Sequence, residues 1–461
     1  MTTQREVKCG IGVDFGTTNS SVALFDCKDV VNVEFPMEEG TIVPSAIYIR
    51  RTGLSPAVGG AAVDAYFRHN AGHAVQLKAA DLGELDLHAA DQTFTFQIHG
   101  LAEADMPGRL LRSLKRWLGD EKLETMQIFE WEHPVPGLIA RILSYLGTGI
   151  GLMDGETVCL GRPVHFGGVD DVAQERLAAA AAEAGMSPSF YPEPVAAAVS
   201  YLHGRARGDT GTYLCFDFGG GTLDVCVLKA SGDRFRILAT YGIPLGGDVI
   251  DQLIYKHKVF PELGDGCPLT LVGPGGSERT YLFHLFQYEE ELLNWQLSHR
   301  LNRPEVVAPV RRHMKLDGET GLKFRRLHAV IRRNLSYAVL RAIEQAKIEL
   351  SERQEATIEV PTIDMAVPIT RAEFEGYMVK PLDDIEGCLR TVLDRAAVSE
   401  AEITNVICTG GSSRIPAVQA RLEQAFGRPV VEHETFAGVA SGLALAHYHG
   451  YVSPLGATGG Q

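Results

Sequence analysis

Two stretches of the sequence each place an aspartate, glycine and threonine where an apolar run ends. In the stretch Ile11 to Phe25, IGVDFGTTNSSVALF, Asp14 is followed by Gly16. In the stretch Tyr213 to Lys229, YLCFDFGGGTLDVCVLK, Asp217 is followed by three glycines. Glycine has no Cβ, so such turns can adopt positive φ angles and their N–H groups can converge on an anion. A carboxylate at the strand end can hold hydrated Mg²⁺ beside a phosphate.

Both stretches predict the same local structure, which is a strand, a tight polar turn and a returning strand. Taken alone, each glycine turn is equally consistent with an ordinary β-turn between core strands. Two copies of one hairpin can hold a single polyphosphate from two sides, and the repetition favours that interpretation. The pair therefore predicts two lobes with a cleft between them.

The composition restricts the classes of partner. The chain has 461 residues, 45 % of them hydrophobic, and its 43 Lys and Arg against 58 Asp and Glu give a net charge of −15. This charge argues against nucleic acid and anionic membrane as main partners. The first residues contain no apolar signal region, and no later apolar run approaches the roughly 20 residues of a membrane span. We expect a cytoplasmic protein whose eight cysteines are buried thiols, with no metal site built from cysteine or histidine.

Several predicted elements surround the first hairpin. Residues 52–108 indicate a small peripheral subdomain, and residues 110–118, LLRSLKRWL, have helical spacing of apolar residues. Lys115 lies on this expected helix, where a solvated position is the ordinary alternative to a functional one. Residues 170–184 predict a helix that Gly185 ends. Glu193 lies between two prolines at the start of the next expected helix, where it can also serve simply to complement the helix dipole.

The second half of the chain follows a polar, glycine-rich segment, residues 204–212, which we interpret as the lobe boundary. Gly246 and Gly247 predict a turn with Asp248 as the N-cap of a helix, and residues 260–334 predict a second, mostly helical insertion. On the expected helix 338–351, Glu344 and Lys347 lie one turn apart. They form either an exposed ion pair or a face that meets a nucleoside. Later, a strand at 405–409 precedes a glycine bend and another helix, 417–426.

Seven segments follow one another along the sequence: DFGTTNSS, LLRSLKRWLG, YPEPVAAAVSYL, FDFGGGTLDV, LGGDVID, AIEQAKIELS and ICTGGSSRIP. Taken together and in this order, they resemble the ATPase domain of the seventy-kilodalton heat-shock (DnaK-type) chaperones. The likeness covers most of the chain and is weak over residues 52–108 and in the insertion before residue 341. It implies a bilobal, actin-like α/β fold with two RNase H-like cores, each with a peripheral insertion. Lobe I is expected to span 1–207 (core 1–50 and 125–207, insertion 51–124), and lobe II to span 208–461 (core 208–247 and 357–461, insertion 248–356).

The resemblance also implies a role for individual residues in binding ATP or ADP with Mg²⁺. Asp14, Asp217 and Glu193 match the acidic residues around Mg²⁺ and the attacking water, and Lys115 matches a lysine that reaches the γ-phosphate. The remaining positions match nucleotide contacts: Gly16, Thr17, Thr18 and Asn19 in the first phosphate loop; Gly219, Gly220, Gly221 and Thr222 in the second; Gly246 and Gly247 beside it; and Glu344, Lys347, Ser351, Gly410, Gly411, Ser412 and Arg414 around the nucleoside.

The sequence departs from the family at several places, and two of these departures bear most directly on the expected function. Ile348 stands where the chaperones have an arginine that stacks on adenine, so the preference for adenine is less secure than phosphate binding. Only a short tail follows residue 448, so we expect no peptide-binding domain, as in the truncated YegD-like branch. The expected function is slow, Mg²⁺-dependent ATP hydrolysis by a chaperone-like protein with an unknown client or co-chaperone. A nucleotide-gated scaffold or actin-like polymer, and a small-molecule kinase of the same fold, are the alternatives.

Overall fold

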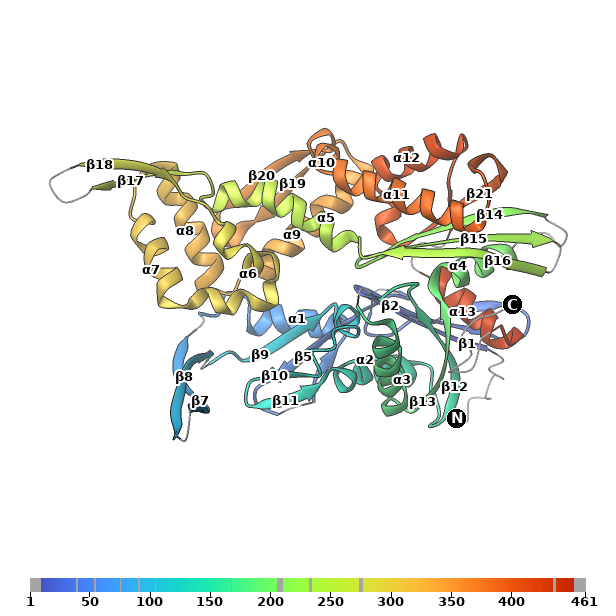
Figure 1. Ribbon diagram of the computed structural model, residues 1–461, viewed down its shortest axis with the longest axis horizontal. Coiled ribbons are helices and arrows are strands. Elements are labelled where there is room, and N and C mark those ends of the chain that lie inside the picture. The colour runs from blue at the N-terminus through green and yellow to red at the C-terminus, as the bar shows by residue number, and fades with distance from the viewer. Residues whose placement is uncertain are drawn as a thin grey trace.

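Each half of the protein is built on one mixed β-sheet, and the two halves form two lobes (Figure 1). The computed structural model describes residues 10–451, apart from 39, 54, 75, 90–91, 104, 167, 205–209, 232–233, 273–276 and 434–436. The sheet of lobe I contains β1 (Gly10–Phe15), β2 (Asn19–Phe25), β3 (Val30–Asn32), β4 (Val43–Pro44), β12 (Glu156–Arg162) and β13 (Met186–Pro192). The sheet of lobe II contains β14 (Thr210–Phe218), β15 (Leu223–Ser231), β16 (Arg234–Ile243), β21 (Ile403–Thr409) and β22 (Val431–Glu432).

The two sheets repeat one strand order. In lobe I the order is β13-β12-β1-β2-β3, with β4 paired to β2, and in lobe II it is β16-β15-β14-β21-β22, which is the same order in the opposite sense. In each sheet the first two strands form an antiparallel hairpin, and the third strand along the chain, β3 or β16, pairs antiparallel with the second. A later strand, β12 or β21, pairs in parallel with the first. The two glycine stretches form these hairpins. The predicted bilobal α/β fold with a duplicated core is therefore confirmed.

Helices cover both sheets in layers. Helices α2 (Val135–Gly149) and α3 (Asp170–Glu183) pack on one face of the lobe I sheet. On lobe II, α11 (Val379–Ala396) and α12 (Pro416–Phe426) pack on the outer face, following α10 (Arg371–Tyr377). Helices α4 (Glu193–His203) and α13 (Gly438–His449) share a core with residues of both sheets. Figure 1 shows α13 beside β1 of lobe I, although its residues follow those of lobe II.

The contact between α4 and α13 requires small residues. A Cβ added to Gly442 of α13 would lie 1.7 Å from the carbonyl oxygen of Ala196 in α4. The run of alanines in α4 and the alanines and glycines of α13 are buried at this crossing. Their composition follows from the close approach of the two helix backbones, which larger side chains would prevent.

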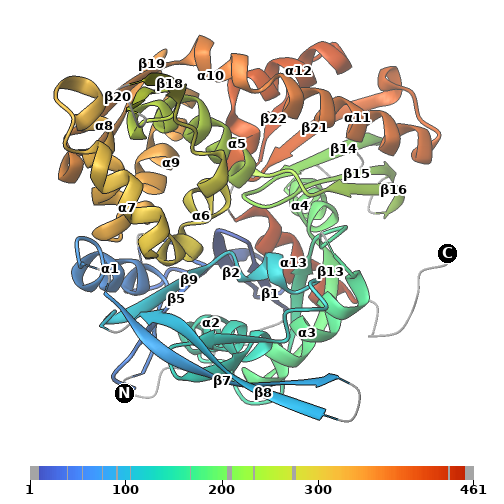
Figure 2. The ribbon, with the colours of Figure 1, turned by 60° about the vertical axis from the view of Figure 1, so that its left-hand side comes forward.

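The remaining strands and helices complete the two lobes. Those of lobe I are β5 (Ala46–Arg50), β6 (Ala57–Val58), α1 (Gly60–His69), β7 (Leu77–Ala89), β8 (Gln92–Glu103), β9 (Gly108–Arg112), the 3₁₀ helix Leu114–Trp117, β10 (Thr125–Ile128) and β11 (Trp131–Pro134). Those of lobe II are α5 (Gly247–Ile254), the π-helical turn Tyr255–Val259, β17 (Pro268–Val272), β18 (Glu278–Leu282), α6 (Glu289–Leu293), the 3₁₀ helix Trp295–Asn302, α7 (Pro304–His313), α8 (Gly318–Arg332), α9 (Ser336–Glu352), β19 (Glu355–Val360) and β20 (Met365–Thr370). Figure 2 shows α1 and β9 of lobe I below α6 and α7 of lobe II.

Short 3₁₀ turns complete the chain at Phe260–Leu263, Phe286–Tyr288, Pro361–Ile363, Glu400–Glu402 and Gly411–Arg414. The limits of the lobes and insertions remain predictions. Part of the glycine-rich segment in which we place the lobe boundary, residues 205–209, lies outside the described residues.

Several local predictions were wrong. The segment 110–118 is not one helix, because β9 continues to Arg112 and only a short 3₁₀ helix, Leu114–Trp117, follows. Pairing of β9 with β5 overrides its helical spacing. Asp248 lies in the first turn of α5, and Gly246 is the N-cap. The second insertion is mostly helical but also contains the β17–β18 hairpin, and β13 was not predicted.

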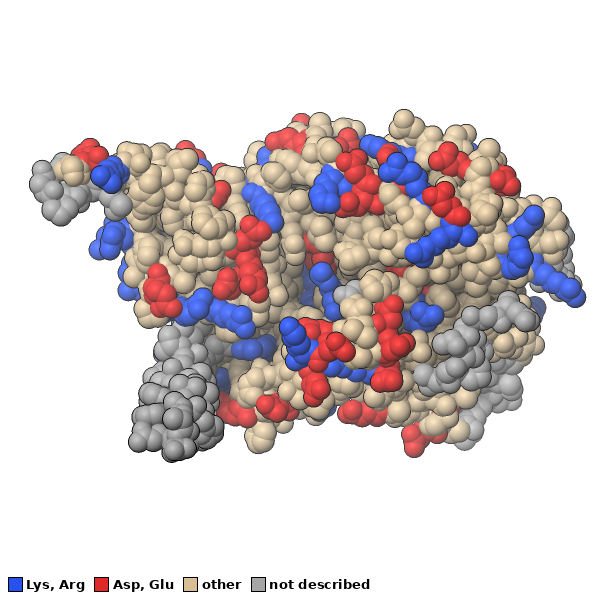
Figure 3. Space-filling model, viewed as in Figure 1, with Lys and Arg blue, Asp and Glu red and all other residues tan. Residues whose placement is uncertain are grey.

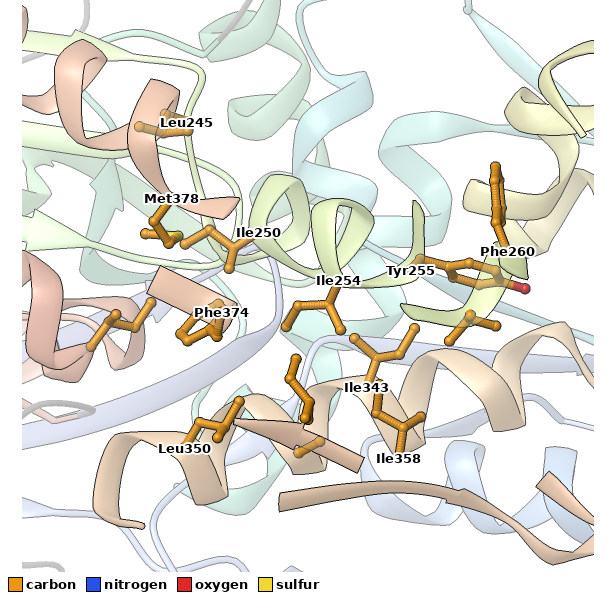
Figure 4. Packing of buried hydrophobic residues seen from close by; sticks show 14 of the residues in the cluster. Leu245, Ile250, Ile254, Tyr255, Phe260, Ile343, Leu350, Ile358, Phe374 and Met378 are labelled. Carbon is orange, nitrogen blue, oxygen red and sulfur yellow. The ribbon is translucent and has the colours of Figure 1, made fainter. Parts of the chain in front are cut away.

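Helices α5 and α9 are held together by a common apolar core (Figure 4). Ile250 and Ile254 on α5 belong to the same buried cluster as Ile343 and Leu350 on α9. These residues recur at helical spacing, which leaves the opposite, polar face of each helix available to the cleft. The core thus fixes the two helices that present Asp248 and Glu344.

Charges of both signs are interspersed on the face of the molecule in Figure 3. No helix in the described part of the chain is long and apolar enough to cross a membrane. Six cysteines, Cys159, Cys215, Cys226, Cys267, Cys388 and Cys408, are buried free thiols as predicted. Cys27 differs, because it is exposed and disulfide-bonded.

The α4–α13 crossing makes a testable prediction for stability. Gly442→Ala should lower the free energy of unfolding by about 3 kcal/mol, because its methyl group overlaps the backbone of α4. Urea denaturation followed by circular dichroism measures the change.

Gly387→Ala in α11 is the matched control. A Cβ there meets no atom within 4 Å, so the same substitution should raise stability by about 0.5–1 kcal/mol through helix propensity. Equal effects of the two substitutions would contradict the proposed role of the crossing.

Candidate nucleotide site

The two glycine turns touch one another between the lobes. A Cβ on Gly220 would lie 2.1 Å from Thr18 Oγ1, and a Cβ on Gly221 would lie 2.7 Å from Thr17 Oγ1. Neither these two glycines nor Gly219 has a positive φ angle, so our reason for glycine at these positions was wrong. Gly220 and Gly221 are required because the opposing threonines approach the backbone closely, whereas a Cβ on Gly219 would meet only the Thr222 carbonyl oxygen, at 3.8 Å.

A cavity of about 100 Å³ lies between the two turns. It is lined by Asp14, Gly16, Thr17, Thr18, Asn19, Ser20, Lys115, Glu193, Asp217, Gly219, Gly220, Gly221, Thr222, Gly410, Gly411 and Val439. Asp14 stands at the end of β1, Asp217 at the end of β14, and Glu193 at the first position of α4. The structure therefore brings together the acidic residues, both turns and the lysine that the sequence singled out.

The carboxylates of this cavity repel one another. Burial, and then the charge of Glu193, raise the pKa of Asp14 to about 8. The same two causes raise the pKa of Asp217 to about 7, although Thr409 Oγ1 donates a hydrogen bond of 3.0 Å to its Oδ1. A cation that binds near these carboxylates would stabilise their ionised forms and reduce their mutual repulsion.

Lys115 faces the cavity rather than solvent. It is 5 % exposed, and its Nζ donates to Glu193 Oε1 at 2.5 Å. Burial lowers the pKa of Lys115, but the charges of Glu193, Asp14 and Asp224 and the hydrogen bond to Glu193 together outweigh this effect and raise it. Gly161 leaves space for Glu193, since a Cβ there would lie 3.2 Å from Glu193 Oε1. The solvated alternative for Lys115 is thus excluded by its position.

Asp224 belongs to this acidic group, although we did not single it out in the sequence. It is 1 % exposed, and Val164 N donates to its Oδ1 at 2.7 Å, which links the two lobes. Burial, and then Glu193, raise its pKa to about 7. The signal was present, because a tight turn pairs Asp217 with Asp224 across the hairpin. Residues directly opposite in an antiparallel pair point to the same side of the sheet.

A larger cavity of about 450 Å³ adjoins the first and shares Thr18, Asn19, Gly219, Gly220 and Gly411 with it. Its wall includes Glu344, Lys347 and Ser351 of α9, together with Gly247, Ser412 and Arg414. The sequence left open an exposed ion pair between Glu344 and Lys347, and the structure does not contain it. Lys347 Nζ lies 2.7 Å from Asp251 Oδ1, and Glu344 Oε1 lies 3.4 Å from Arg112 Nη1.

Backbone packing shapes the turns around the larger cavity. Gly410 has a φ of +77°, and a Cβ there would lie 2.4 Å from the carbonyl oxygen of Phe218. Ser412 Oγ donates to the Gly219 carbonyl oxygen at 2.9 Å, and Gly247 N donates to the same oxygen at 3.0 Å. A Cβ on Gly246 would lie 2.3 Å from the Gly220 carbonyl oxygen. The second glycine turn is therefore held from two sides.

The two connected cavities suit a ligand with an anionic end and a less polar end. The small cavity offers backbone turns, a buried lysine and carboxylates, whereas the wall of the large one includes Ile348, which is 57 % exposed. No group of three or more His, Cys, Asp or Glu side chains in the described residues is placed to hold a metal ion directly. Asp14 and Asp217 fit a hydrated cation, which they would hold through water.

Comparison with known proteins agrees with this geometry. A family model described as Hsp70 protein matches residues 155–261 and 325–446, which include the second hairpin, α9 and the Gly410 turn. The chain contains an Hsp70-type ATPase domain.

Curated relatives of this Hsp70-type domain are distant. The Chaperone protein DnaK of Halobacterium salinarum is 27 % identical over 344 residues, covering 70 % of this chain and 43 % of that protein. The Chaperone protein HscA homolog of Shewanella oneidensis is 25 % identical over 443 residues, covering 95 % of this chain and 58 % of that protein. The chain thus spans about half the length of these relatives.

Asp224 gives this site a pH-dependent stability. Its raised pKa means that the folded state binds more protons than the unfolded state between about pH 4 and pH 7, so stability falls as the pH rises through this window. Asp224→Asn should therefore stabilise the nucleotide-free protein at pH 8 by on the order of 2 kcal/mol, and much less at pH 4.5.

Urea unfolding at the two pH values tests this expectation. Asp383→Asn, which changes an exposed carboxylate of α11, is the control and should show little effect at either pH. A gain for Asp224→Asn that is equal at both pH values would contradict the electrostatic explanation.

Proposed function

We propose that this chain binds Mg·ATP between its lobes and hydrolyses it slowly. The observation that supports the proposal most strongly is the meeting of both glycine turns around a cavity that also holds Lys115 and Glu193. The larger adjoining cavity supports it further, because it provides space for a nucleoside beside a polyphosphate. The Hsp70-type domain makes ATP the expected ligand.

In this proposal the phosphates occupy the small cavity. N–H groups of the turns at Gly16–Thr18 and Gly219–Thr222 would donate to phosphate oxygens. Asp14 and Asp217 would hold Mg²⁺ through water, and the ion would neutralise part of the negative charge of the polyphosphate. Binding would also relieve the repulsion that raises the pKa values of both aspartates.

Hydrolysis requires a water molecule in line with the γ-phosphate. In this proposal Glu193, whose carboxylate accepts a hydrogen bond of 2.5 Å from Lys115 Nζ, would orient that water together with Asp14. Lys115 Nζ supplies a fixed positive charge where negative charge redistributes in the transition state. Because the site is buried, this charge acts at lower dielectric than it would in solvent.

The nucleoside would occupy the larger cavity. Glu344, Lys347 and Ser351 would contact the ribose and the base, and the backbone at Gly410–Ser412 would allow close approach of a flat ring. Ile348 offers the base an apolar face without the stacking charge of an arginine. We therefore infer that the protein selects adenine over other bases only weakly, whereas its binding of the polyphosphate does not depend on this position.

Closure of the lobes around ATP would be the output of the cycle. The curated relatives are named as chaperones, so a chaperone-like role with client or co-chaperone proteins as partners is the corresponding proposal. Both lobes contribute to every part of the proposed site, and this arrangement makes occupancy and closure interdependent.

Isothermal titration calorimetry of the wild-type protein tests the proposal. Mg·ATP and Mg·ADP should bind measurably, Mg·GTP more weakly, and chelation of Mg²⁺ should reduce affinity at least about tenfold, or 1.4 kcal/mol. A parallel phosphate-release assay should show slow turnover of ATP. The absence of binding heat for all three nucleotides would refute the proposed function.

Lys115→Ala separates chemistry from binding. Turnover should fall about 10²–10³-fold, as for other lost electrostatic donors in buried sites, while the Kd for ATP stays nearly unchanged. Phosphate release and calorimetry measure the two quantities.

Lys122→Ala is the control, since Lys122 is exposed and lies just beyond the 3₁₀ helix that contains Lys115. Thermal unfolding of both variants checks that they fold, because removing Lys115 leaves Glu193 without its partner. Unchanged turnover in a folded Lys115→Ala protein would contradict its catalytic assignment.

A further inference from the structure

Arg112 crosses from one lobe to the other. It is the last residue of β9 in lobe I, and its Nη1 donates to Tyr337 Oη on α9 of lobe II at 2.9 Å. The same nitrogen lies 3.4 Å from Glu344 Oε1. The carbonyl oxygen of Arg112 also accepts a hydrogen bond of 2.9 Å from Gln296 Nε2 in lobe II. Both the main chain and the side chain of Arg112 thus bind the opposite lobe.

The guanidinium of Arg112 is buried with its hydrogen-bonding capacity incompletely used. The residue is 7 % exposed, and its Nε is buried without a hydrogen-bond partner among the described residues. Burial lowers the pKa of Arg112, but Glu344, Tyr337 and Asp248 together outweigh this effect and raise it. A buried charge of this kind depends on its counter-ion, because removal of one partner leaves the other uncompensated.

Arg112 borders the space proposed for the nucleoside. It lines the cavity of about 450 Å³, and it also lines a neighbouring cavity of about 370 Å³ that lies between the lobes. Glu344 lines both cavities as well. The pair therefore stands at the boundary of the two spaces, and only Oε1 of the Glu344 carboxylate is directed to Arg112.

We propose that Arg112 is a positioning residue that holds Glu344 in place to accept hydrogen bonds from the ribose hydroxyls of the nucleotide. This inference rests on the proposed function, because it assumes a nucleoside in the larger cavity. Arg112 acts through Glu344, whose second carboxylate oxygen is left for the ligand.

The interaction depends on the distance between the lobes. A separation of 3.4 Å is already at the outer limit of a hydrogen bond. A small opening of the cleft would break both the Glu344 and Tyr337 contacts of Arg112, and Glu344 would lose its fixed position. Ribose binding and closure therefore favour one another, as two events that select the same state must.

Nucleotides that differ only in the ribose test this role. Wild-type protein should bind Mg·ADP about tenfold more tightly than its 2′,3′-dideoxy analogue, the value of one or two hydrogen bonds to a charged acceptor. Arg112→Gln should weaken ADP binding by about the same factor and leave the dideoxy affinity almost unchanged. Glu344→Gln should give the same ratio of dideoxy to ADP affinity as Arg112→Gln. The double variant should discriminate between the two nucleotides no less than either single variant.

Two control variants separate positioning from general effects on closure. Tyr337→Phe removes the other hydrogen bond of the Arg112 side chain, while Glu344 keeps its partner. Arg116→Gln removes a different pair across the lobes, between Arg116 Nη1 and Asp248 Oδ2 at 3.1 Å. Both controls should keep the wild-type ratio of dideoxy to ADP affinity, even where they weaken both nucleotides.

The outcomes are distinguishable from failure of the proposed function. If wild-type protein binds no nucleotide, the proposed function fails. If wild-type protein binds nucleotide without discriminating the ribose hydroxyls, or if Arg112→Gln discriminates as well as wild type, only the role of Arg112 fails. If Arg112→Gln does not fold, Arg112→Lys replaces it as the test, because lysine keeps the positive charge without the planar guanidinium. Arg112→Lys should still prefer ADP over its dideoxy analogue less strongly than the wild-type protein does.

Discussion

The crossing of α4 and α13 between the two sheets is the packing constraint on which the rest of the structure depends. At Gly442 the helices are so close that a methyl group has no space. The residues of this crossing share one core with strands of both lobes, so the position of each sheet is set against the same pair of helices. Glu193 begins α4, and its carboxylate therefore has a defined place relative to both glycine turns.

Electrostatic repulsion is the second feature of the site. Asp14, Asp217 and Asp224 are all near Glu193, and burial together with that neighbour raises the pKa of each. Lys115 is the cation that pairs with Glu193 inside the cavity. The folded protein maintains this unfavourable arrangement because the extensive apolar cores of both lobes stabilise it. Such local instability is typical of sites that are completed by a ligand.

The sequence was sufficient where a local pattern determines the structure. Both hairpins, the helix that begins at Glu193 and the helix that presents Glu344 formed as predicted, because turn glycines and helix periodicity act over short distances. Prediction failed where distant pairing decides. Residues of β9 have a helical pattern but form a strand because they pair with β5. Lys347 forms an ion pair with Asp251 and not with Glu344, which lies one helical turn away. Arg112 had no local signal, since the partners of its side chain, Tyr337 and Glu344, are more than two hundred residues away. The roles of the individual site residues stay predictions.

The position of α13 has a consequence for the order in which the chain acquires its structure. Ile11 N of β1 donates to His447 Nδ1 of α13 at 2.9 Å, across a sequence separation of 436 residues. Strand β1 therefore has one face of its sheet uncovered until α13, which lies 436 residues later in the sequence at His447, has been synthesised. Contacts of such long separation slow folding, and apolar strands exposed meanwhile are prone to aggregate. A protein with an Hsp70-type domain is thus itself a demanding substrate for assisted folding.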